Sequence, residues 1–141
     1  MNRVDIKVRL DDGAYMPTKG HTFDGGLDLR CKEDVDATCM DTVVIDTGVH
    51  MIIPNGYAGI IIGRSGLHMK DSIFTQGLID SDYTGSIKVR LHTDDIDTLH
   101  FCAGDKIAQI VIVEVPFIHL SLDYIQHSEP RRDNGFGSTG R

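Results

Sequence analysis

Two carboxylates and a tyrosine stand close together in residues 77–85, Gly-Leu-Ile-Asp-Ser-Asp-Tyr-Thr-Gly. Apolar residues lead into this stretch and alternate with polar ones after it, which predicts a strand, a tight turn and a returning strand. On such a hairpin Asp80 is placed to act as a general base, with Tyr83 as an aromatic surface for a sugar or another ring. Asp, Ser and Gly also favour turns for backbone reasons, and a solvated acidic turn is the simpler explanation of these nine residues alone.

A second group with chemical potential is Gly-Arg-Ser-Gly at residues 63–66, directly after the aliphatic run 60–62. A strand that ends here offers backbone N–H groups, the Ser65 hydroxyl and the Arg64 guanidinium to one anion. The segment is not a Walker A loop, because the glycine-lysine-serine/threonine ending is missing. A surface ion pair of Arg64 explains the residues equally well.

Two single residues could assist an anion site. Gln109 follows the turn at the start of segment 104–109, and its amide could donate to a phosphate, although a turn before a core strand explains the segment equally well. Asp28 is flanked by Leu27 and Leu29, which is unusual for a carboxylate unless it is hydrogen-bonded or lies near a cation.

Residues 135–140, Gly-Phe-Gly-Ser-Thr-Gly, match the pattern GxGxxG. That fingerprint needs a strand before it and a helix after it, and only one residue follows here, so a dinucleotide-binding fold is rejected. A flexible arm fits better, because its glycines let the backbone close around phosphates while Phe136 stacks on a base, a contact of about 1–3 kcal/mol. By itself the segment is more typical of a disordered tail.

The elements that must position these residues are strands, because period-two patterns and short aliphatic runs recur where helical periodicity is scarce. A helical turn is expected only at residues 66–71. Many short strands separated by turn residues predict an all-β barrel or jelly roll, with one domain over residues 1–128 and a flexible arm over 129–141. The expected strands are 6–10, 27–31, 43–53, 57–62, 73–79, 86–92 and 107–115.

Composition narrows the possible functions. The chain has 141 residues, enough for one domain, and its net charge of −7 argues against coating nucleic acid, so a polyphosphate would need locally concentrated basic groups and a divalent cation. No apolar stretch is long enough for a membrane span or a signal peptide. Three cysteines without CxxC spacing indicate reduced thiols and an intracellular, cytoplasmic location, and neither cysteine nor histidine spacing indicates a metal site.

Taken together and in order, five segments resemble the five motifs of the trimeric dUTP pyrophosphatase (dUTPase) family: residues 25–29, 63–67, 77–85, 104–109 and 131–140. The resemblance covers the whole chain. It implies a distorted jelly-roll subunit, a homotrimer whose three active sites are each shared by all three chains, and hydrolysis of dUTP to dUMP and diphosphate with Mg²⁺. Such an enzyme lowers dUTP and supplies dUMP for thymidylate synthesis.

The resemblance also implies residue roles. Asp80 matches the carboxylate that activates water for attack on the α-phosphorus, and Tyr83 matches the residue under the deoxyribose, where a 2′-hydroxyl would clash. The remaining catalytic residues match groups of the family that bind the phosphates, and they are Arg64, Ser65 and Gln109. The other substrate-binding matches are Gly66 in the phosphate loop, the backbone of Gly77, Leu78 and Ile79 at the uracil edge, Lys88 on the following strand, and Arg131, Phe136, Gly137 and Ser138 in the arm. Asp28 matches the carboxylate that reaches Mg²⁺ through water.

Three positions depart from the family pattern: Gly25, Phe74 and Arg132. The last leaves open whether Arg131 or Arg132 meets the phosphates. Two alternatives remain, a dCTP deaminase-like enzyme of the same fold and a non-catalytic nucleotide-sensing or protein-binding module. The Asp80 and Tyr83 pair and the GFGSTG arm favour the dUTPase.

Overall fold

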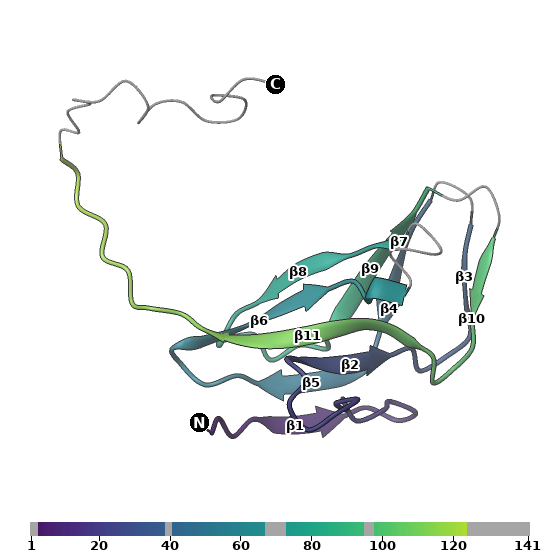
Figure 1. Ribbon diagram of the computed structural model, residues 1–141, viewed down its shortest axis with the longest axis horizontal. Helices are drawn as coiled ribbons and strands as arrows, with labels where there is room; N and C mark the ends of the chain where they lie inside the picture. The colour runs from purple at the N-terminus through teal and green to yellow at the C-terminus, as the bar shows by residue number, and fades with distance from the viewer. Residues whose placement is uncertain (1–2, 39–40, 67–72, 95–97, 124–141) are drawn as a thin grey trace.

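The computed structural model describes residues 3–38, 41–66, 73–94 and 98–123, and these ranges form an all-β structure (Figure 1). The strands are β1 (Lys7–Leu10), β2 (Gly26–Arg30), β3 (Val35–Ala37), β4 (Thr42–Asp46), β5 (Val49–Ile52), β6 (Tyr57–Ile62), β7 (Ile73–Phe74), β8 (Gln76–Ile79), β9 (Lys88–Thr93), β10 (Leu99–Phe101) and β11 (Lys106–Glu114). No helix in these ranges has the length and apolarity to cross a membrane.

All strand pairs are antiparallel and form four small sheets. The largest has the order β2-β11-β6-β8, a three-stranded sheet has the order β4-β9-β7, and two ribbons pair β1 with β5 and β3 with β10. Neighbours in a sheet are far apart in the chain, as expected for the distorted jelly roll that the sequence predicts.

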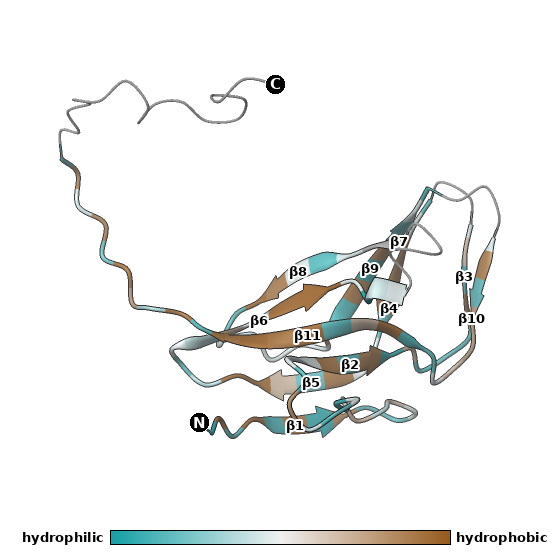
Figure 2. Ribbon diagram, viewed as in Figure 1, coloured by the Kyte–Doolittle hydropathy of each residue, from teal (hydrophilic) through white to brown (hydrophobic). Residues whose placement is uncertain are grey.

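The core lies between the sheets and is made by the inward-facing residues of each strand. Ile87, Val89 and Leu91 alternate into it, each with at most 1% of its surface exposed, which confirms the period-two pattern after residue 85. Ile107 and Ile110 of β11 are fully buried beside them. Figure 2 shows apolar residues concentrated along β6, β11 and β2. Each such side chain contributes about 1.5–3 kcal/mol on burial, so the core fixes the strand register that places the polar residues.

Several expected elements have different bounds in the structure. The run 43–53 forms two strands, because Asp46 Oδ1 accepts a hydrogen bond from the Gly48 N–H at 2.9 Å and the chain turns there. The run 73–79 divides into β7 and β8. The short strands β3 and β10 were not predicted. Ser65 and Gly66 are helical, and the rest of the expected helical turn lies outside the described residues.

The predicted hairpin around residue 80 was wrong in its pairing. β8 and β9 flank the turn as expected, but β8 pairs with β6 whereas β9 pairs with β4 and β7 in another sheet. The returning chain finds its partners where β4 ends and β5 begins, since Ile87 N–H donates to Val49 O at 2.8 Å and Thr47 N–H donates to Ile87 O at 3.1 Å. Residues 80–86 therefore cross from one sheet to the other.

After β11 the chain leaves the sheet. Val115 N–H donates to Gly56 O at 2.7 Å, and residues 115–123 then run away from the body without belonging to a strand (Figure 1). Their large apolar side chains face solvent, with exposed fractions of 96% for Phe117 and 105% for Leu122. The boundary expected at residue 128 and the arm 129–141 lie outside the described residues.

Candidate active site

Strand register brings three of the expected phosphate-binding elements together. Asp28 of β2 lies directly opposite Gln109 of β11, which in turn lies opposite Ile62 at the end of β6. Directly paired residues project from the same face of a sheet. The loop 63–66 continues from β6, so Asp28, Gln109 and the loop with Arg64 and Ser65 gather at one end of the four-stranded sheet.

A β-bulge adds Lys106 to this group. Lys106 and Gln109 are three positions apart in the chain, and in a regular strand residues at this spacing face opposite sides. The register shifts between Lys106 and Ala108 in the β2–β11 ladder, and the extra residue turns Lys106 toward Asp28. Sequence reasoning did not select Lys106 as a site residue. The available signal was a basic residue at the start of the segment 104–109, but the bulge cannot be read from the sequence pattern.

Asp28 holds the centre of a cationic cluster. Its Oδ1 lies 3.3 Å from Arg64 Nε and its Oδ2 lies 2.7 Å from Lys106 Nζ, and its side chain is only 13% exposed. Two basic side chains therefore face one carboxylate here, in a chain with a net charge of −7. The expectation that Asp28 needs a nearby cation is confirmed, and the arrangement suits an incoming anion.

Gly26 provides the space for the Gln109 side chain. A Cβ at Gly26 would collide with the Gln109 amide oxygen and would lie 3.1 Å from its Cδ. Gln109 Nε2 donates to the Gly63 carbonyl over a long 3.4 Å, which links β11 to the start of the phosphate loop. The close approach of the β2 backbone therefore sets the position of the amide.

These residues surround an open pocket of ≈ 370 Å³. The loop before β2 also contributes to its wall through His21 and Asp24, which sequence reasoning had not selected. His21 N–H donates to Asp24 Oδ2 at 2.7 Å, and this contact closes the loop. The pocket is lined by Gly20, His21, Asp24, Gly25, Gly26, Asp28, Arg64, Ser65, Gly66, Lys106 and Gln109.

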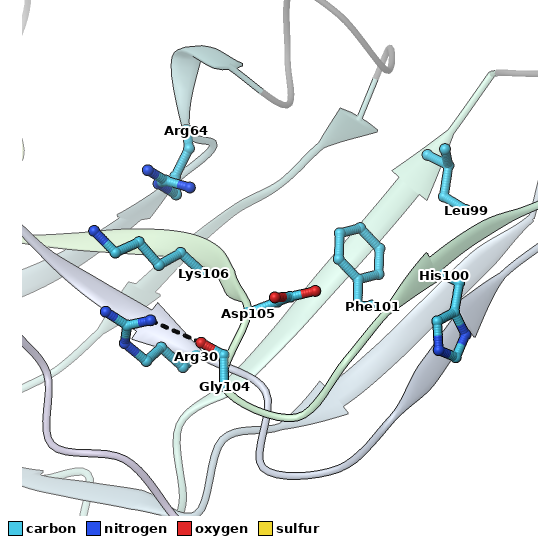
Figure 3. A pocket seen from close by; sticks show the side chains of 8 residues that line it. All are labelled: Arg30, Arg64, Leu99, His100, Phe101, Gly104, Asp105 and Lys106. Atoms are coloured by element: carbon cyan, nitrogen blue, oxygen red, sulfur yellow. Dashed lines mark hydrogen bonds between the residues drawn. The ribbon is translucent and has the colours of Figure 1, made fainter.

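A second pocket of ≈ 410 Å³ shares Arg64 and Lys106 with the first. Figure 3 shows these two side chains and Arg30 on one side of it, opposite Phe101 and its neighbours. Arg30 Nη1 donates to the Gly104 carbonyl at 2.7 Å, which ties the end of β2 to the turn before β11. The basic groups of this edge are therefore concentrated where the two pockets meet.

Residues 80–86 form a compact turn between the sheets, which is called the Asp80 turn below. Tyr83 N–H donates to Asp80 O at 3.2 Å, and the Tyr83 hydroxyl donates to Ser86 O at 2.7 Å. A Cβ at Gly85 would lie 2.6 Å from the Tyr83 hydroxyl oxygen, so only glycine admits the ring there. Asp80 and Tyr83 are both exposed, and the ring is held in place by its own turn.

Side chains from two other strands hold the Asp80 turn from outside. The Ser86 hydroxyl donates to Asp46 Oδ1, and this hydrogen bond holds the pKa of Asp46 below its ordinary value, with further help from the Gly48 N–H and Lys32. His50 contacts the Thr84 carbonyl through Nδ1 at 2.9 Å. The turn is therefore attached on both sides of Gly85.

The Asp80 turn and the phosphate pocket do not meet within one chain. In the β6–β8 ladder Gln76 lies opposite Ile62, beside the phosphate loop, whereas Ile79 lies opposite Gly59. Asp80 is thus about 20 Å from Arg64 along the strand direction, at about 3.3 Å per residue. The structure groups the expected site residues into two clusters at opposite ends of the same strand pair.

Three further expectations concern residues outside both clusters. Lys88 begins β9 opposite Asp46 of β4 and does not line the phosphate pocket. Gly77, Leu78 and Ile79 lie in β8, the edge strand of its sheet. The arm residues lie outside the described residues: Arg131, Phe136, Gly137 and Ser138.

Metal binding was expected only through Asp28. Among the described residues no three His, Cys, Asp or Glu side chains are grouped to hold a metal ion. Each Asp28 oxygen already faces a cation but has a second lone pair, which can accept a hydrogen bond from a metal-bound water. This donor set fits an ion that takes its direct ligands from phosphates and water, as Mg²⁺ often does.

The dUTPase family model matches residues 12–140 of the chain. A deoxyuridine 5′-triphosphate nucleotidohydrolase from Cutibacterium acnes is 38% identical over 130 residues, which cover 89% of this chain and 85% of that protein. The structure of the Staphylococcus bacteriophage 80alpha dUTPase with dUPNHPP superposes with a TM-score of 0.88 at 26% identity and covers 97% and 99% of the two chains.

A mutant dUTPase from phage phi11 of S. aureus, described for the coordination of a structural Mg(II) ion, superposes with a TM-score of 0.83. It is 27% identical and covers 89% of this chain and all of that one, 100%. The similarity thus extends over both clusters of candidate site residues.

Proposed function

The chain belongs to the dUTPase family, and from this membership we propose that it hydrolyses dUTP to dUMP and diphosphate in the cytoplasm. The observation that carries the proposal is the phosphate pocket, where strand register and a bulge gather Arg64, Lys106 and Gln109 around Asp28. In an acidic chain, Arg64 and Lys106 supply basic groups at this pocket that can bind the phosphates of a nucleotide.

In this proposal the triphosphate occupies the pocket. Arg64 donates a planar fork of N–H groups to phosphate oxygens, and the Ser65 hydroxyl, the Gly66 backbone and the Gln109 amide supply further donors. The same donors stabilise the charge that develops on the phosphates during hydrolysis. The cationic cluster around Asp28 supports this assignment.

Asp80 acts as the general base, which takes a proton from the water that attacks the α-phosphorus. Tyr83 packs under the deoxyribose and leaves no room for a 2′-hydroxyl. The fixed ring of Tyr83, held by Gly85 and Ser86, supports this role because an immobile ring can exclude one additional oxygen.

Uracil is recognised by backbone groups of Gly77, Leu78 and Ile79. Their strand, β8, pairs with β6 on one side only, and the other edge of such a strand offers N–H and C=O groups for pairing. Cytosine reverses the donor at N3 and the acceptor at C4 and would leave buried polar groups unpaired, which can support discrimination of about 10⁴-fold.

Mg²⁺ is the proposed cofactor, and Asp28 would hold one of its water ligands. Once bound, the ion would neutralise and organise the phosphates. Lys88 is proposed to approach the substrate from β9. Arg131 would contact the terminal phosphate, while Phe136, with Gly137 and Ser138 beside it, would cover uracil as the arm 129–141 closes over the β domain 1–128.

We further propose a homotrimer with shared active sites. Two site clusters about 20 Å apart in one chain can combine only if copies are juxtaposed. Apolar surface supports such contacts: Ile60 and Leu78 pair across β6 and β8 with exposed fractions of 37% and 64%, and the extended residues 115–123 expose further large apolar side chains.

Incubation with dUTP, dCTP, dTTP and UTP in the presence of Mg²⁺, followed by product identification, tests the activity. The proposal expects dUMP and diphosphate from dUTP and little turnover of the other three. Release of ammonia from dCTP would instead indicate a deaminase, and no turnover of any nucleotide would indicate a binding module.

A further inference from the structure

His50 of β5 links the Asp80 turn to the β1 strand. Its side chain is 11% exposed, and both of its ring nitrogens have partners. Nε2 lies 3.1 Å from each carboxylate oxygen of Asp11, so Nε2 donates in this pair. The ring is thereby held in one orientation, with Nδ1 directed at the turn.

Nδ1 of His50 has two partners, and they require opposite protonation states of this nitrogen. The Thr84 carbonyl, at 2.9 Å, can only accept, so it requires a proton on Nδ1. Arg9 Nη2, at 3.0 Å, can only donate, so it requires the Nδ1 lone pair. Since Nε2 keeps its proton for Asp11, the charged ring bonds to Thr84 and the neutral ring accepts from Arg9.

We propose that His50 is a positioning residue for hydrolysis, which as an imidazolium holds the Thr84 carbonyl and fixes the Asp80 turn, and as a neutral ring releases it. This inference rests on the proposed roles of Asp80 and Tyr83. Thr84 lies directly after Tyr83, so loss of its anchor loosens the part of the turn that carries both groups.

The surroundings favour the charged ring more than they would in a free histidine, because they raise the pKa of His50. The Thr84 carbonyl, followed by Asp11, raises the pKa of His50, whereas burial and the charge of Arg9 oppose the rise. Lys32 and Asp46 form an ion pair at 3.9 Å beside Gly48, two residues before His50 in the chain. A raised pKa means that the anchor is fully present below the ordinary value of 6.5 and is lost as the pH rises through the pKa of the folded protein.

An NMR titration of the substrate-free protein monitors the hydrogen bond between His50 and the Thr84 carbonyl directly. The amide of Gly85 shares its peptide group with the Thr84 carbonyl, so its chemical shift reports the hydrogen bond to His50. We expect the Gly85 amide and the His50 ring protons to titrate with one common midpoint above 6.5, and the Gly85 step to vanish in His50→Gln. A Gly85 amide that stays constant while His50 titrates would overturn the proposal, whether or not any variant folds.

Kinetics test the consequence for hydrolysis. His50→Phe fills the space but donates nothing, and we expect kcat/KM at pH 6 to fall by about 10- to 100-fold, the effect of a small displacement of reacting groups. His50→Gln retains an amide donor for Thr84, so it should recover most of this loss with a flat pH profile through the histidine range. Equal losses in both variants would show a merely structural role and contradict the proposal.

The matched control is His92→Gln. His92 makes a similar pair, with Nε2 at 2.9 Å from Asp94 and Nδ1 at 3.0 Å from the Thr42 hydroxyl, but it does not contact the Asp80 turn. Its kinetics and its Gly85 titration should match the wild type. Unchanged turnover in Asp80→Asn would refute the proposed catalytic turn, whereas the Gly85 titration decides the His50 anchor independently of turnover.

Discussion

Asp80 and Asp82 occupy the same exposed turn, but only Asp80 matches the catalytic motif. The hydrogen bond between Tyr83 N–H and Asp80 O holds the backbone of Asp80 at the start of the turn. Since both residues carry the same carboxylate, the proposed difference in role depends on position within the turn and, in the proposed homotrimer, on what a neighbouring copy would bring to it.

Asp80→Asn should reduce kcat by about 10²–10⁴-fold, because the amide cannot take a proton from water. Affinity for a non-hydrolysable dUTP analogue should remain close to that of the wild type, since the phosphate donors are untouched. Single-turnover kinetics and calorimetric titration measure the two quantities. Asp82→Asn is the control and should keep near-normal kcat, and a variant Asp80→Asn with normal kcat would remove Asp80 from the mechanism.

Hydrogen bonding of Ser86 to Asp46 gives a prediction about stability. A depressed pKa of Asp46 means that the pair stabilises the fold above the ordinary value of 3.8 and that this contribution is lost as the pH falls below it. Ser86→Ala should therefore lower Tm at pH 7 and lower it less at pH 3, as measured by thermal unfolding followed by circular dichroism. A Tm deficit that grows on acidification would contradict this linkage.

At the scale of elements, the sequence predicted those strands that depend only on the local pattern of apolar and polar residues. The strand β9, which buries alternate residues, and the aliphatic strand β11 were found because their hydrophobic patterns are visible in the sequence itself. The ribbon of β3 and β10 was missed because each strand has three residues and pairs with a partner about sixty residues away. The hairpin at Asp80 was wrong because a strand-turn-strand pattern does not state which sheet the returning strand joins.

In the candidate site too, residue types could be predicted from the sequence, whereas the spatial arrangement depended on strand pairing. Asp28, Arg64 and Gln109 were selected by their types, and register then placed them in one pocket. Lys106 was not predicted as a site residue because the orientation of its side chain depends on the β-bulge, and this bulge forms only against the partner strand β2. His50 was not predicted either, because its proposed role depends on contacts with Asp11 and Thr84, which are remote in sequence.

Removal of the proposed C-terminal arm should separate folding from activity. Deleting residues 131–141 should abolish turnover, because the proposed contacts of Arg131 and Phe136 are lost. The core strands end at Glu114, so the thermal unfolding transition should remain cooperative with little change in Tm. Circular dichroism and product analysis test both statements. A melted core would show that the segment is structural.

At the scale of the whole molecule, the separation of the two clusters is the feature with the largest consequence. Each chain carries the proposed phosphate pocket at one end of the β6–β8 pair and the Asp80 turn at the other. In the proposed homotrimer a single chain would therefore contribute to two different sites. Apolar residues on β6, β8 and the segment 115–123 provide the surface that juxtaposed copies would cover.

Complementation between two inactive variants tests the shared site most directly. Arg64→Ala damages the phosphate pocket and Asp80→Asn removes the base, so each homotrimer should be inactive. When the two chains are refolded together, about a quarter of the sites should combine an intact pocket with an intact base and regain activity, as expected for random mixing in a cyclic oligomer. Absence of any recovered dUTP hydrolysis in verified mixed oligomers would contradict the shared site and require both clusters to act within one chain.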